Sequence, residues 1–366
     1  MKKILVYGMS ENSGGIESVI MNYYRRIDKN RFQFDFIIHD DKIAYEDEIK
    51  SFGGKIFNLT PRRNYFVYKK EIKKFFKNNA KNYDAIWVNS CTLSNIDYLK
   101  LAKKYGIKLR IIHSHNSRNM GTALTFILHH FNKLIVNKYA TDFWSCGELA
   151  SKWFYNKKII NSSAHKIINN AIDVELFRFN KDIRNSYRKE LGIENDFVIG
   201  NVGRLHFQKN QEFLIDIFEE IKKVKHNSKL LLIGDGEDKE KLMKIVSQKK
   251  LENNVIFLGV RSDISNLMHS IDCFVFPSVF EGLPVALFEA QAAGLKIYAS
   301  DTISDKSKID SNLIFLSLSL APSEWARIIV NNYQEGYDRL KSNDKMLISN
   351  YNINGQIADF EKFLEG

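Results

Sequence analysis

The stretch VFPSVFEGLPVALFEAQAAG, residues 275–294, decides the fold of this chain. Its first residues have the apolar character of a buried strand, a short loop follows, and the remainder has the length of a helix. Pro284 suits the first turn of that helix, and Gly294 suits its C-terminal cap. A buried strand that leads through a loop into a helix predicts a parallel sheet within an α/β structure.

The same alternation of apolar strands and amphipathic helices extends over the whole chain. Strands are predicted at 2–8, 32–39, 85–89, 109–115 and 142–146, and then at 197–203, 229–234, 255–259, 273–278 and 296–300. Helices are predicted between them, and those at 16–27 and 210–224 have the clearest helical spacing. Two sets of about five strands indicate two Rossmann-like domains.

The length of 366 residues also favours two domains, because a single hydrophobic core rarely grows so large. The polar stretch 176–195 is the expected boundary. It gives an N-terminal domain of residues 1–178 and a C-terminal domain of residues 179–350. Residues 351–366 are predicted to form one more helix.

Composition restricts the class of protein. Hydrophobic residues make up 44% of the chain, which is typical of a globular protein and excludes a disordered one. Cys91, Cys146 and Cys273 are far apart and odd in number, which favours a reducing, cytoplasmic compartment. No run of about 18 apolar residues occurs, so we expect no membrane-spanning helix. The N-terminal MKKILVYGMS has too short an apolar run for a signal peptide and is predicted to be a strand.

The positive charge lies in the first half of the chain. Residues 1–180 hold 30 Lys and Arg against 16 Asp and Glu, a balance of +14, whereas residues 181–366 hold 24 against 27, a balance of −3. This asymmetry predicts an anionic partner for the N-terminal half, such as a membrane surface, a phosphorylated acceptor or nucleic acid. Nucleic acid is the least favoured, because no recognised binding module occurs.

Segment 61–83 is the most basic part of that half, with eight Lys and Arg and only Glu71 as an acid. Apolar residues recur in it at helical spacing, so one face must pack on the N-terminal sheet. The basic face is then either ordinary solvated surface or a patch that docks on anionic lipid. The apolar positions are Tyr65, Tyr68, Ile72 and Phe75 or Phe76.

Two carboxylates in the opening stretch are candidates for a binding site. Glu281 lies in the loop, and Glu289 lies about one and a half turns into the helix. Carboxylates near the carboxyl end of a parallel strand face the crevice where α/β proteins bind ligands, and they accept hydrogen bonds from sugar or ribose hydroxyls. The alternative is that both are surface glutamates of an ordinary helix.

Two cations occupy a second loop, in the stretch VGRLHFQKN, residues 202–210. Arg204 and Lys209 lie between a strand and the start of a helix. Main-chain N–H groups, the helix dipole and two cations together suit a diphosphate. The alternative is a pair of solvated basic residues.

The N-terminal half offers two weaker candidates. Gly14 and Gly15 open the first helix, where a loop without side chains lets the backbone approach a ligand closely. His113 and His115 end a strand on the same side, since side chains alternate along a strand. No third zinc ligand is evident near these histidines.

Two motifs are absent from the sequence. No D-x-D occurs, which is the motif that usually holds the metal in one of the two major folds of glycosyltransferases. No G-x-S-x-G occurs, which makes the nucleophile elbow of an α/β-hydrolase improbable.

Together, these stretches resemble glycosyltransferase family 4, and above all its members that build bacterial capsule, exopolysaccharide or O-antigen. The resemblance rests on SGGIESVI, RIIHSHN, GNVGRLHFQKNQEFLIDIF, LLIGDGEDKEKL and FEGLPVALFEAQAAG, in this order along nearly the whole chain. Glu281 and Glu289 match the family's E-x7-E motif. The resemblance implies a GT-B fold, in which two Rossmann-like domains face a central cleft and a last helix, here 351–366, returns to the N-terminal domain.

The resemblance also implies roles for residues of the C-terminal half. Arg204 and Lys209 would bind the donor diphosphate. Glu289 would bind the ribose hydroxyls, and Glu281 would contact the hydroxyls of the donor sugar. The main chain near Glu281 would contribute as well, through Gly282 and Leu283.

In the N-terminal half, the resemblance implies that Gly15, with Gly14 beside it, approaches the donor phosphate. His115 would contact the donor sugar near the reaction centre, and His113 is the less favoured of the two histidines.

The implied activity is that of a retaining, metal-independent hexosyltransferase without cofactors. It would move a sugar from a nucleotide sugar, by expectation a UDP-sugar, to a saccharide or lipid-linked acceptor in the biosynthesis of surface polysaccharide. The enzyme would be cytoplasmic or peripheral on the inner face of the membrane, which it would reach through 61–83. The alternative is a nucleotide-sugar 2-epimerase of similar fold, which would need no acceptor; a non-catalytic nucleotide-sugar-binding protein is less favoured.

Overall fold

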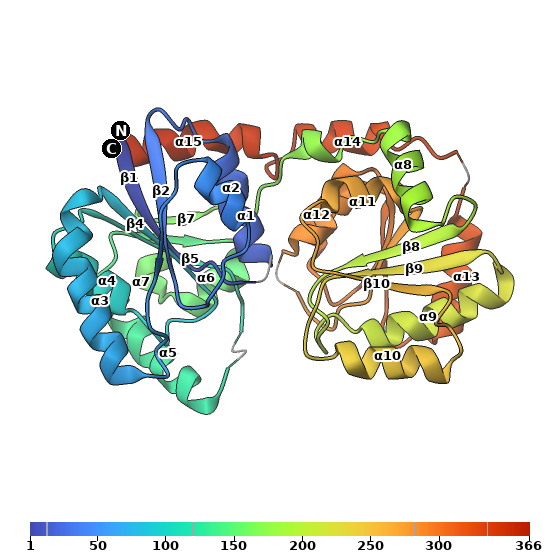
Figure 1. Ribbon diagram of the computed structural model, residues 1–366, viewed down its shortest axis with the longest axis horizontal. Helices are drawn as coiled ribbons and strands as arrows, with labels where there is room; N and C mark the ends of the chain where they lie inside the picture. Colours follow the sequence, from blue (N-terminus) through green and yellow to red (C-terminus); the bar gives the residue numbers. More distant parts are fainter. Residues whose placement is uncertain (12–13, 119–120, 282, 335) are drawn as a thin grey trace. The chain divides into compact units, whose positions relative to one another are not determined.

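The computed structural model describes residues 1–11, 14–118, 121–281, 283–334 and 336–366. The chain forms two compact units (Figure 1). The N-terminal unit consists of Met1–Asn170 together with Asn354–Gly366, and the C-terminal unit consists of Ala171–Ile353. The division therefore falls eight residues before the boundary expected from the sequence. The reason is local: Ile172 forms a β-bridge with Asn352, and the 3₁₀ turn Val174–Phe177 packs on helices of the C-terminal unit.

The N-terminal unit contains a parallel sheet in the strand order β3-β2-β1-β4-β5-β6-β7. Its strands are β1 (Lys2–Tyr7), β2 (Phe32–Ile38), β3 (Ile56–Asn58), β4 (Ala85–Ser90), β5 (Leu109–Ser114), β6 (Asp142–Ser145) and β7 (His165–Ile167). Its helices are α1 (Gly15–Arg26), α2 (Glu46–Ser51), α3 (Tyr65–Asn79), α4 (Asp97–Lys104), α5 (Ala123–Ile135), α6 (Glu148–Phe154), α7 (Lys157–Ile160) and α15 (Ile353–Glu365).

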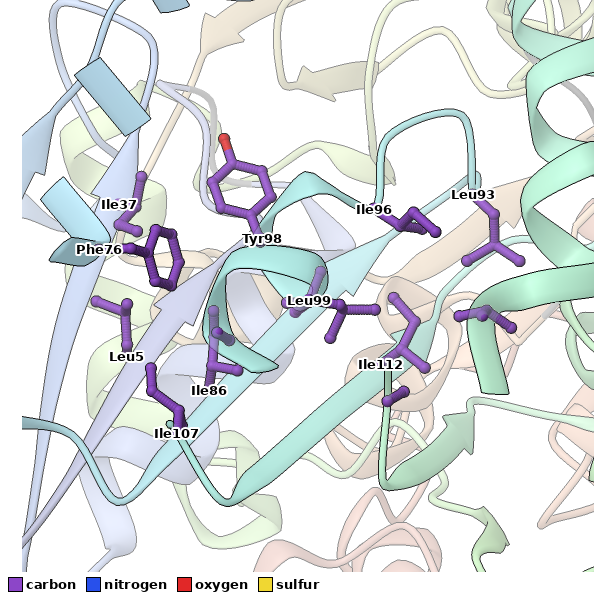
Figure 2. Close-up of a cluster of buried hydrophobic side chains, with 14 of the residues drawn as sticks. Leu5, Ile37, Phe76, Ile86, Leu93, Ile96, Tyr98, Leu99, Ile107 and Ile112 are labelled. Atoms are coloured by element: carbon purple, nitrogen blue, oxygen red, sulfur yellow. The ribbon is translucent and has the colours of Figure 1, made fainter. Parts of the chain in front are cut away.

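Helices cover both faces of this sheet, as parallel strands require. On one face, apolar side chains of α3 and α4 pack against β1, β4 and β5, and Figure 2 shows Phe76 and Leu99 meeting Leu5, Ile86 and Ile112 there. On the other face, α1 and α15 cover the aromatic side chains of the strands. This arrangement buries alternate residues of β4 on opposite sides, so the strand needs apolar residues throughout.

The last helix, α15, closes the second face of the N-terminal sheet. Phe360 lies 5.3 Å from the ring of Trp87 and 4.7 Å from that of Tyr23, measured between ring centroids. The Tyr23 hydroxyl donates to Gln356 Oε1 over 2.5 Å, and Arg31 pairs with Glu361 at 3.1 Å. The N-terminal unit is thus built from both ends of the chain described here.

The C-terminal unit contains a second parallel sheet, in the order β10-β9-β8-β11-β12-β13. Its strands are β8 (Phe197–Val202), β9 (Ser228–Ile233), β10 (Val255–Gly259), β11 (Cys273–Phe276), β12 (Lys296–Ser300) and β13 (Leu313–Leu316). Its helices are α8 (Lys181–Leu191), α9 (Gln211–Val224), α10 (Lys239–Gln248), α11 (Ile264–Ser270), α12 (Val285–Ala292), α13 (Pro322–Asn332) and α14 (Leu340–Leu347). The prediction of two Rossmann-like domains with parallel sheets is confirmed.

A buried arginine anchors the end of the C-terminal unit. Arg339, at the N-terminal cap of α14, is only 8% exposed, and its guanidinium donates to main-chain oxygens of four residues. Gly294 follows α12 with a φ of +67°, and a Cβ there would lie 2.0 Å from the carbonyl oxygen of Arg339. The close approach explains why a glycine ends α12. The four acceptors are Met268, His269, Ile271 and Ala293.

The strand order reverses once in each sheet, between β1 and β4 and again between β8 and β11. At such a point the connections leave the sheet on opposite faces, and a crevice opens at the carboxyl ends of the two strands. The loops after β1, β4, β8 and β11 are therefore where the fold places ligands. None of the described helices is both long and apolar enough to cross a membrane.

Candidate functional site

In the C-terminal unit, the loops that follow β8 and β11 are joined by an ion pair. Lys209 Nζ lies 2.6 Å from Glu281 Oε1, and the two side chains are only 17% and 8% exposed. The ammonium also lies 4.8 Å from the centre of the Phe276 ring, at the end of β11. The structure thus brings together two residues that the sequence placed 72 positions apart in separate motifs.

Neighbouring residues of the same two loops hold this pair in place. Gln208 accepts from the main-chain N–H of Val279 over 2.8 Å and donates its Nε2 to the carbonyl oxygen of Phe280 over 3.0 Å. Asn210, which caps α9 in a left-handed conformation, donates Nδ2 to the carbonyl oxygen of Pro277 over 3.2 Å. The β8 and β11 loops are consequently a single cross-linked structure at the reversal of strand order.

Arg204 occupies the same loop but has a different partner. Its Nη2 lies 2.9 Å from Glu237 Oε2, and the Arg204 side chain is 69% exposed. His206 Nε2 lies 3.2 Å from the other oxygen of Glu237. Partial burial tends to raise the pKa of Glu237, but a main-chain hydrogen bond, Arg204 and His206 hold it below its usual value. Glu237 is a member of this cluster that sequence reasoning missed.

Two glycines let the loop after β9 fit beneath the loop that carries Arg204. Gly234 has a φ of +135°, and a Cβ there would lie 2.2 Å from the carbonyl oxygen of Gly203. A Cβ on Gly236 would lie 2.3 Å from the carbonyl oxygen of Leu205. In return, Leu205 donates its N–H to Asp235 and accepts one from Asp238, over 3.0 and 3.1 Å. Close backbone packing, rather than a dinucleotide fingerprint, accounts for the G-D-G sequence.

The remaining candidates of this half belong to α12 and the loop before it. Pro284 is the N-terminal cap of α12, one residue before the helix begins. Glu289 is a partly exposed residue within that helix. Leu283 is also partly exposed, and Gly282 lies outside the described residues. Glu281 and Glu289 thus follow the same strand, β11, at the reversal of strand order.

In the N-terminal unit, the carboxylate of Glu17 organises the loop between β1 and α1. Its Oε1 accepts the main-chain N–H and the hydroxyl of Ser10, and its Oε2 accepts the N–H of Gly14 over 3.1 Å. Burial raises the pKa of Glu17, although these hydrogen bonds oppose the change. Gly14 is the N-terminal cap of α1 and Gly15 its first residue, so both lie at a helix N-terminus that suits an anion.

The two histidines lie in different surroundings. His113 is fully buried in β5, with its ring 6.0 Å from that of Trp87 and 5.9 Å from that of Trp144. His115 follows the strand, is partly exposed, and its Nε2 lies 2.9 Å from Asn89 Oδ1 at the end of β4. The rings lie 4.1 Å apart, as expected for side chains on the same side. The placement favours His115 over His113 as a residue that meets a ligand.

Loss of hydration keeps both imidazoles neutral. Burial lowers the pKa of His115 to about 3 and that of His113 well below its ordinary value. With Asn89 Oδ1 as the acceptor, His115 donates from Nε2 and presents Nδ1 as an acceptor. A neutral His115 is suited to hydrogen bonding with a sugar hydroxyl, rather than to supplying a proton.

A polar cavity of ≈ 420 Å³ opens in the N-terminal unit, beside the carboxyl ends of β2 and β3. Its lining offers carboxylates, a guanidinium and an amide, all of which hydrogen-bond to sugar hydroxyls. Both ring nitrogens of His39 are already engaged, by the carbonyl oxygen of Leu59 and the hydroxyl of Tyr98. Sequence reasoning missed this cavity because its residues come from four separate segments. They are Glu11, His39, Asp40, Asp41, Asn58, Thr60, Pro61, Arg63 and Glu71.

Comparison with known proteins identifies the family. The model of the glycosyl transferases group 1 family matches residues 183–308, which include both loops of the Lys209–Glu281 pair. EpsF of Bacillus subtilis, named as a glycosyltransferase, is 32% identical over 339 residues, which cover 90% of this chain and 87% of EpsF. CapH of Staphylococcus aureus, a capsular polysaccharide biosynthesis glycosyltransferase, is 26% identical over 90% of each chain.

Two further proteins extend the comparison. A UDP-Gal:α-D-GlcNAc-diphosphoundecaprenol α-1,3-galactosyltransferase of Escherichia coli is 34% identical over 139 residues, 35% of each chain. The crystal structure of Anabaena HepE in complex with UDP-glucose superimposes with a TM-score of 0.80 over 100% of both chains, at 19% identity. That structural likeness shows the fold, and the relation to EpsF shows the family. The chain therefore belongs to the group 1 glycosyl transferases and has the GT-B fold.

Proposed function

We propose that this enzyme is a retaining hexosyltransferase that takes its sugar from a UDP-sugar and transfers it to a lipid-linked saccharide during the biosynthesis of surface polysaccharide. The observation that supports the donor site is the Lys209–Glu281 pair, held between two loops where the strand order reverses. The names of CapH and of the galactosyltransferase of Escherichia coli support the polysaccharide, the UDP-sugar and the lipid-linked acceptor.

The proposed donor site divides the nucleotide sugar among three groups. The N-terminus of α9 and Lys209 meet the diphosphate, and Arg204 reaches it from the exposed side of the same loop. An ammonium has three N–H donors, so Lys209 can hold Glu281 and a phosphate oxygen together. Glu281 then meets the hydroxyls of the sugar, and Glu289 those of the ribose.

The proposed reaction needs no protein nucleophile. The acceptor hydroxyl oxygen bonds to the anomeric carbon as the bond from that carbon to the diphosphate breaks. The departing phosphate oxygen takes the hydroxyl proton on the same face of the sugar, which retains the configuration. Lys209 and Arg204 stabilise the negative charge that grows on the diphosphate. Glu281 is engaged by Lys209 and Gln208, which suits an orienting role.

The acceptor is proposed to bind in the N-terminal unit, where the polar cavity beside β2 and β3 offers hydrogen bonds to a saccharide. A lipid-linked acceptor would require the enzyme to work at a membrane surface. The exposed basic face of α3 supports this: α3 buries Tyr68, Ile72, Phe75 and Phe76, and exposes Lys70, Lys73, Lys74 and Lys77. Tyr65 is exposed and does not belong to the buried stripe, because it is the first residue of α3 and lies at the helix end.

The decisive experiment incubates the enzyme with a panel of nucleotide sugars and saccharide acceptors and measures free nucleoside diphosphate. We expect nucleoside diphosphate to be released with one UDP-sugar, and only when an acceptor is present. From an α-linked donor, NMR should show an α-linked product. Conversion of the donor to its 2-epimer without an acceptor would replace this proposal by the epimerase. An inverted linkage would contradict retention alone.

Metal removal is expected to leave the transfer rate unchanged. The reason is that Arg204 and Lys209 supply the positive charge at the diphosphate, and the sequence contains no D-x-D. Turnover is measured with excess EDTA and again after Mg²⁺ or Mn²⁺ is added back. Complete loss with EDTA and recovery with either ion would contradict the assignment of the diphosphate to these cations.

The substitution Glu289→Gln is expected to weaken UDP binding about tenfold or more, because a ribose hydroxyl loses a charged acceptor. The thermal stability of the protein without nucleotide should change little, since Glu289 is partly exposed. Calorimetric titration with UDP measures the affinity. Glu240→Gln, a substitution in the first turn of α10, serves as the control. Equal affinity of Glu289→Gln and the wild type would remove Glu289 from the site.

A further inference from the structure

Helix α5 exposes an apolar stripe along its length. Leu124, Ile127, Phe131 and Leu134 recur at the spacing of one helix face, and their side chains are between 61% and 68% exposed. Phe126 beside them is 44% exposed. Scattered single apolar residues are common on protein surfaces, but a continuous stripe over three turns marks an interaction surface.

The polarity of α5 is the reverse of that of an ordinary surface helix, whose apolar residues face the core. Its buried residues are His129 and Asn132, and Ile135 near its end packs partly buried against the core. His129 Nδ1 accepts the main-chain N–H of Leu93 over 3.0 Å, and Asn132 donates Nδ2 to the carbonyl oxygen of the same residue over 2.6 Å. Hydrogen bonds of His129 and Asn132 thus hold the inner face of α5 in place, and its outer face carries the apolar side chains.

A second group of exposed apolar side chains flanks the same loop. Asn132 of α5 contacts Leu93, and Arg62, just before α3, donates to the carbonyl oxygen of the next residue, Ser94, over 2.8 Å. The first turn of α3 therefore lies across the 93–94 loop from α5. Its exposed apolar residues are Tyr65, Phe66 and Val67.

Basic residues predominate around α5. Between Asp97 and Asp142 the sequence holds eight Lys and Arg and no Asp or Glu. Four lysines gather at the C-terminal end of α5: Lys133 donates to Lys152 O over 2.7 Å, and Lys103 donates to Lys138 O over 2.7 Å. Two copies of such a surface would bring like charges together, whereas an anionic surface would neutralise them.

From these observations we propose that the exposed stripe of α5, with the first turn of α3, inserts into the surface of an anionic phospholipid bilayer. The helix would lie in the plane of the interface, with its apolar side chains among the acyl chains and the surrounding lysines at the headgroups. This assigns membrane docking to an apolar surface that basic side chains border, and not to the basic face of α3 alone. The inference rests on the proposed function in one respect: an enzyme that uses a lipid-linked acceptor has to work at a membrane.

Cosedimentation with vesicles tests the surface. Wild-type protein should bind vesicles that contain phosphatidylglycerol and phosphatidylcholine, and bind phosphatidylcholine alone at least about tenfold more weakly. The double variant Ile127→Gln with Phe131→Gln should lose at least about tenfold in affinity for the anionic vesicles, without any change in charge. The matched control is Val224→Gln with Met243→Gln, two exposed apolar residues of the C-terminal unit, and it should bind as the wild type does.

Insertion is tested separately from adsorption. A tryptophan at position 127, introduced as Ile127→Trp, should be quenched by brominated phosphatidylglycerol, whereas one introduced as Val224→Trp should not. Equal vesicle binding by the wild type and the Ile127→Gln, Phe131→Gln variant would overturn the proposal. So would a variant that binds vesicles normally but loses self-association in sedimentation velocity, since the stripe would then join two copies.

The two proposals fail separately. Release of nucleoside diphosphate with a water-soluble acceptor is measured without vesicles, and the Ile127→Gln, Phe131→Gln variant should keep it. A wild type that binds vesicles through α5 but releases no nucleoside diphosphate with any donor would refute the proposed function and leave the docking surface standing.

Discussion

Replacement of Lys209 by methionine is expected to lower the transfer rate between roughly tenfold and 150-fold, because the transition state loses one charge-assisted hydrogen bond to the diphosphate. It should also cost about 1–3 kcal/mol of stability, since Glu281 is 8% exposed and would lose its charged partner. Turnover is measured as nucleoside diphosphate released, and stability by urea unfolding.

Three variants separate charge from packing in this prediction. Lys223→Met, whose side chain is 62% exposed and paired with Glu220 on α9, should change neither quantity. Lys209→Met combined with Glu281→Gln should recover much of the stability and none of the activity. Arg204→Gln should slow transfer without loss of stability, because Arg204 is largely exposed. Wild-type turnover in Lys209→Met would end the assignment of Lys209 to the diphosphate.

Replacement of Arg339 by methionine is expected to destabilise the C-terminal unit by about 3–5 kcal/mol. The substitution removes a buried cation and takes its hydrogen bonds from the carbonyl oxygens of Met268 and Ala293. The carbonyl oxygens of His269 and Ile271 lose one of two donors, because Arg184 also donates to both. For a unit of this size the melting temperature should fall by about 6–20 °C. Differential scanning calorimetry measures the change.

The matched control is Arg327→Met, a substitution on the exposed side of α13. It removes the same charge from the same unit and should shift the melting temperature by less than about 2 °C. A shift of Arg339→Met no larger than that of Arg327→Met would show that the buried guanidinium contributes little to the unit.

The sequence was sufficient to predict the central strands and the edge strand β10, whereas the other three edge strands, β3, β7 and β13, escaped it. β1, β4, β5, β8 and β11 are buried on both faces, so their apolar runs stand out from the flanking segments. β3, β7 and β13 have only three or four residues and lie at sheet edges, where one neighbour and partial exposure leave little apolar signal. Their existence depends on a sheet that is already formed.

The individual residues of the candidate site were predictable, because each lies beside the end of a strand, but their contacts with one another were not. Lys209 and Glu281 each follow a recognisable strand, but their pairing depends on β8 and β11 being neighbours. The same applies to Asn89, which lies near the end of β4 and contacts His115 just after β5. Both Asn89 and Glu237 were detectable as polar residues beside the end of a buried strand or the loop after it. The stripe of α5 was not, because an apolar helix face is normally expected to lie inside.

Helix α15 packs on the first sheet although it is made last, and this determines the order in which the two units can be completed during synthesis. Tyr23 and Gln356, which hydrogen-bond to each other, are 333 residues apart, whereas the C-terminal unit is one continuous segment, Ala171–Ile353. A ribosome therefore completes the second unit before it makes the helix that covers Trp87 and Trp144 of the first. Until then those indoles lack the cover of Phe360 on a growing chain, and a chaperone that recognises exposed aromatic surface would find its target in the first half of the nascent protein.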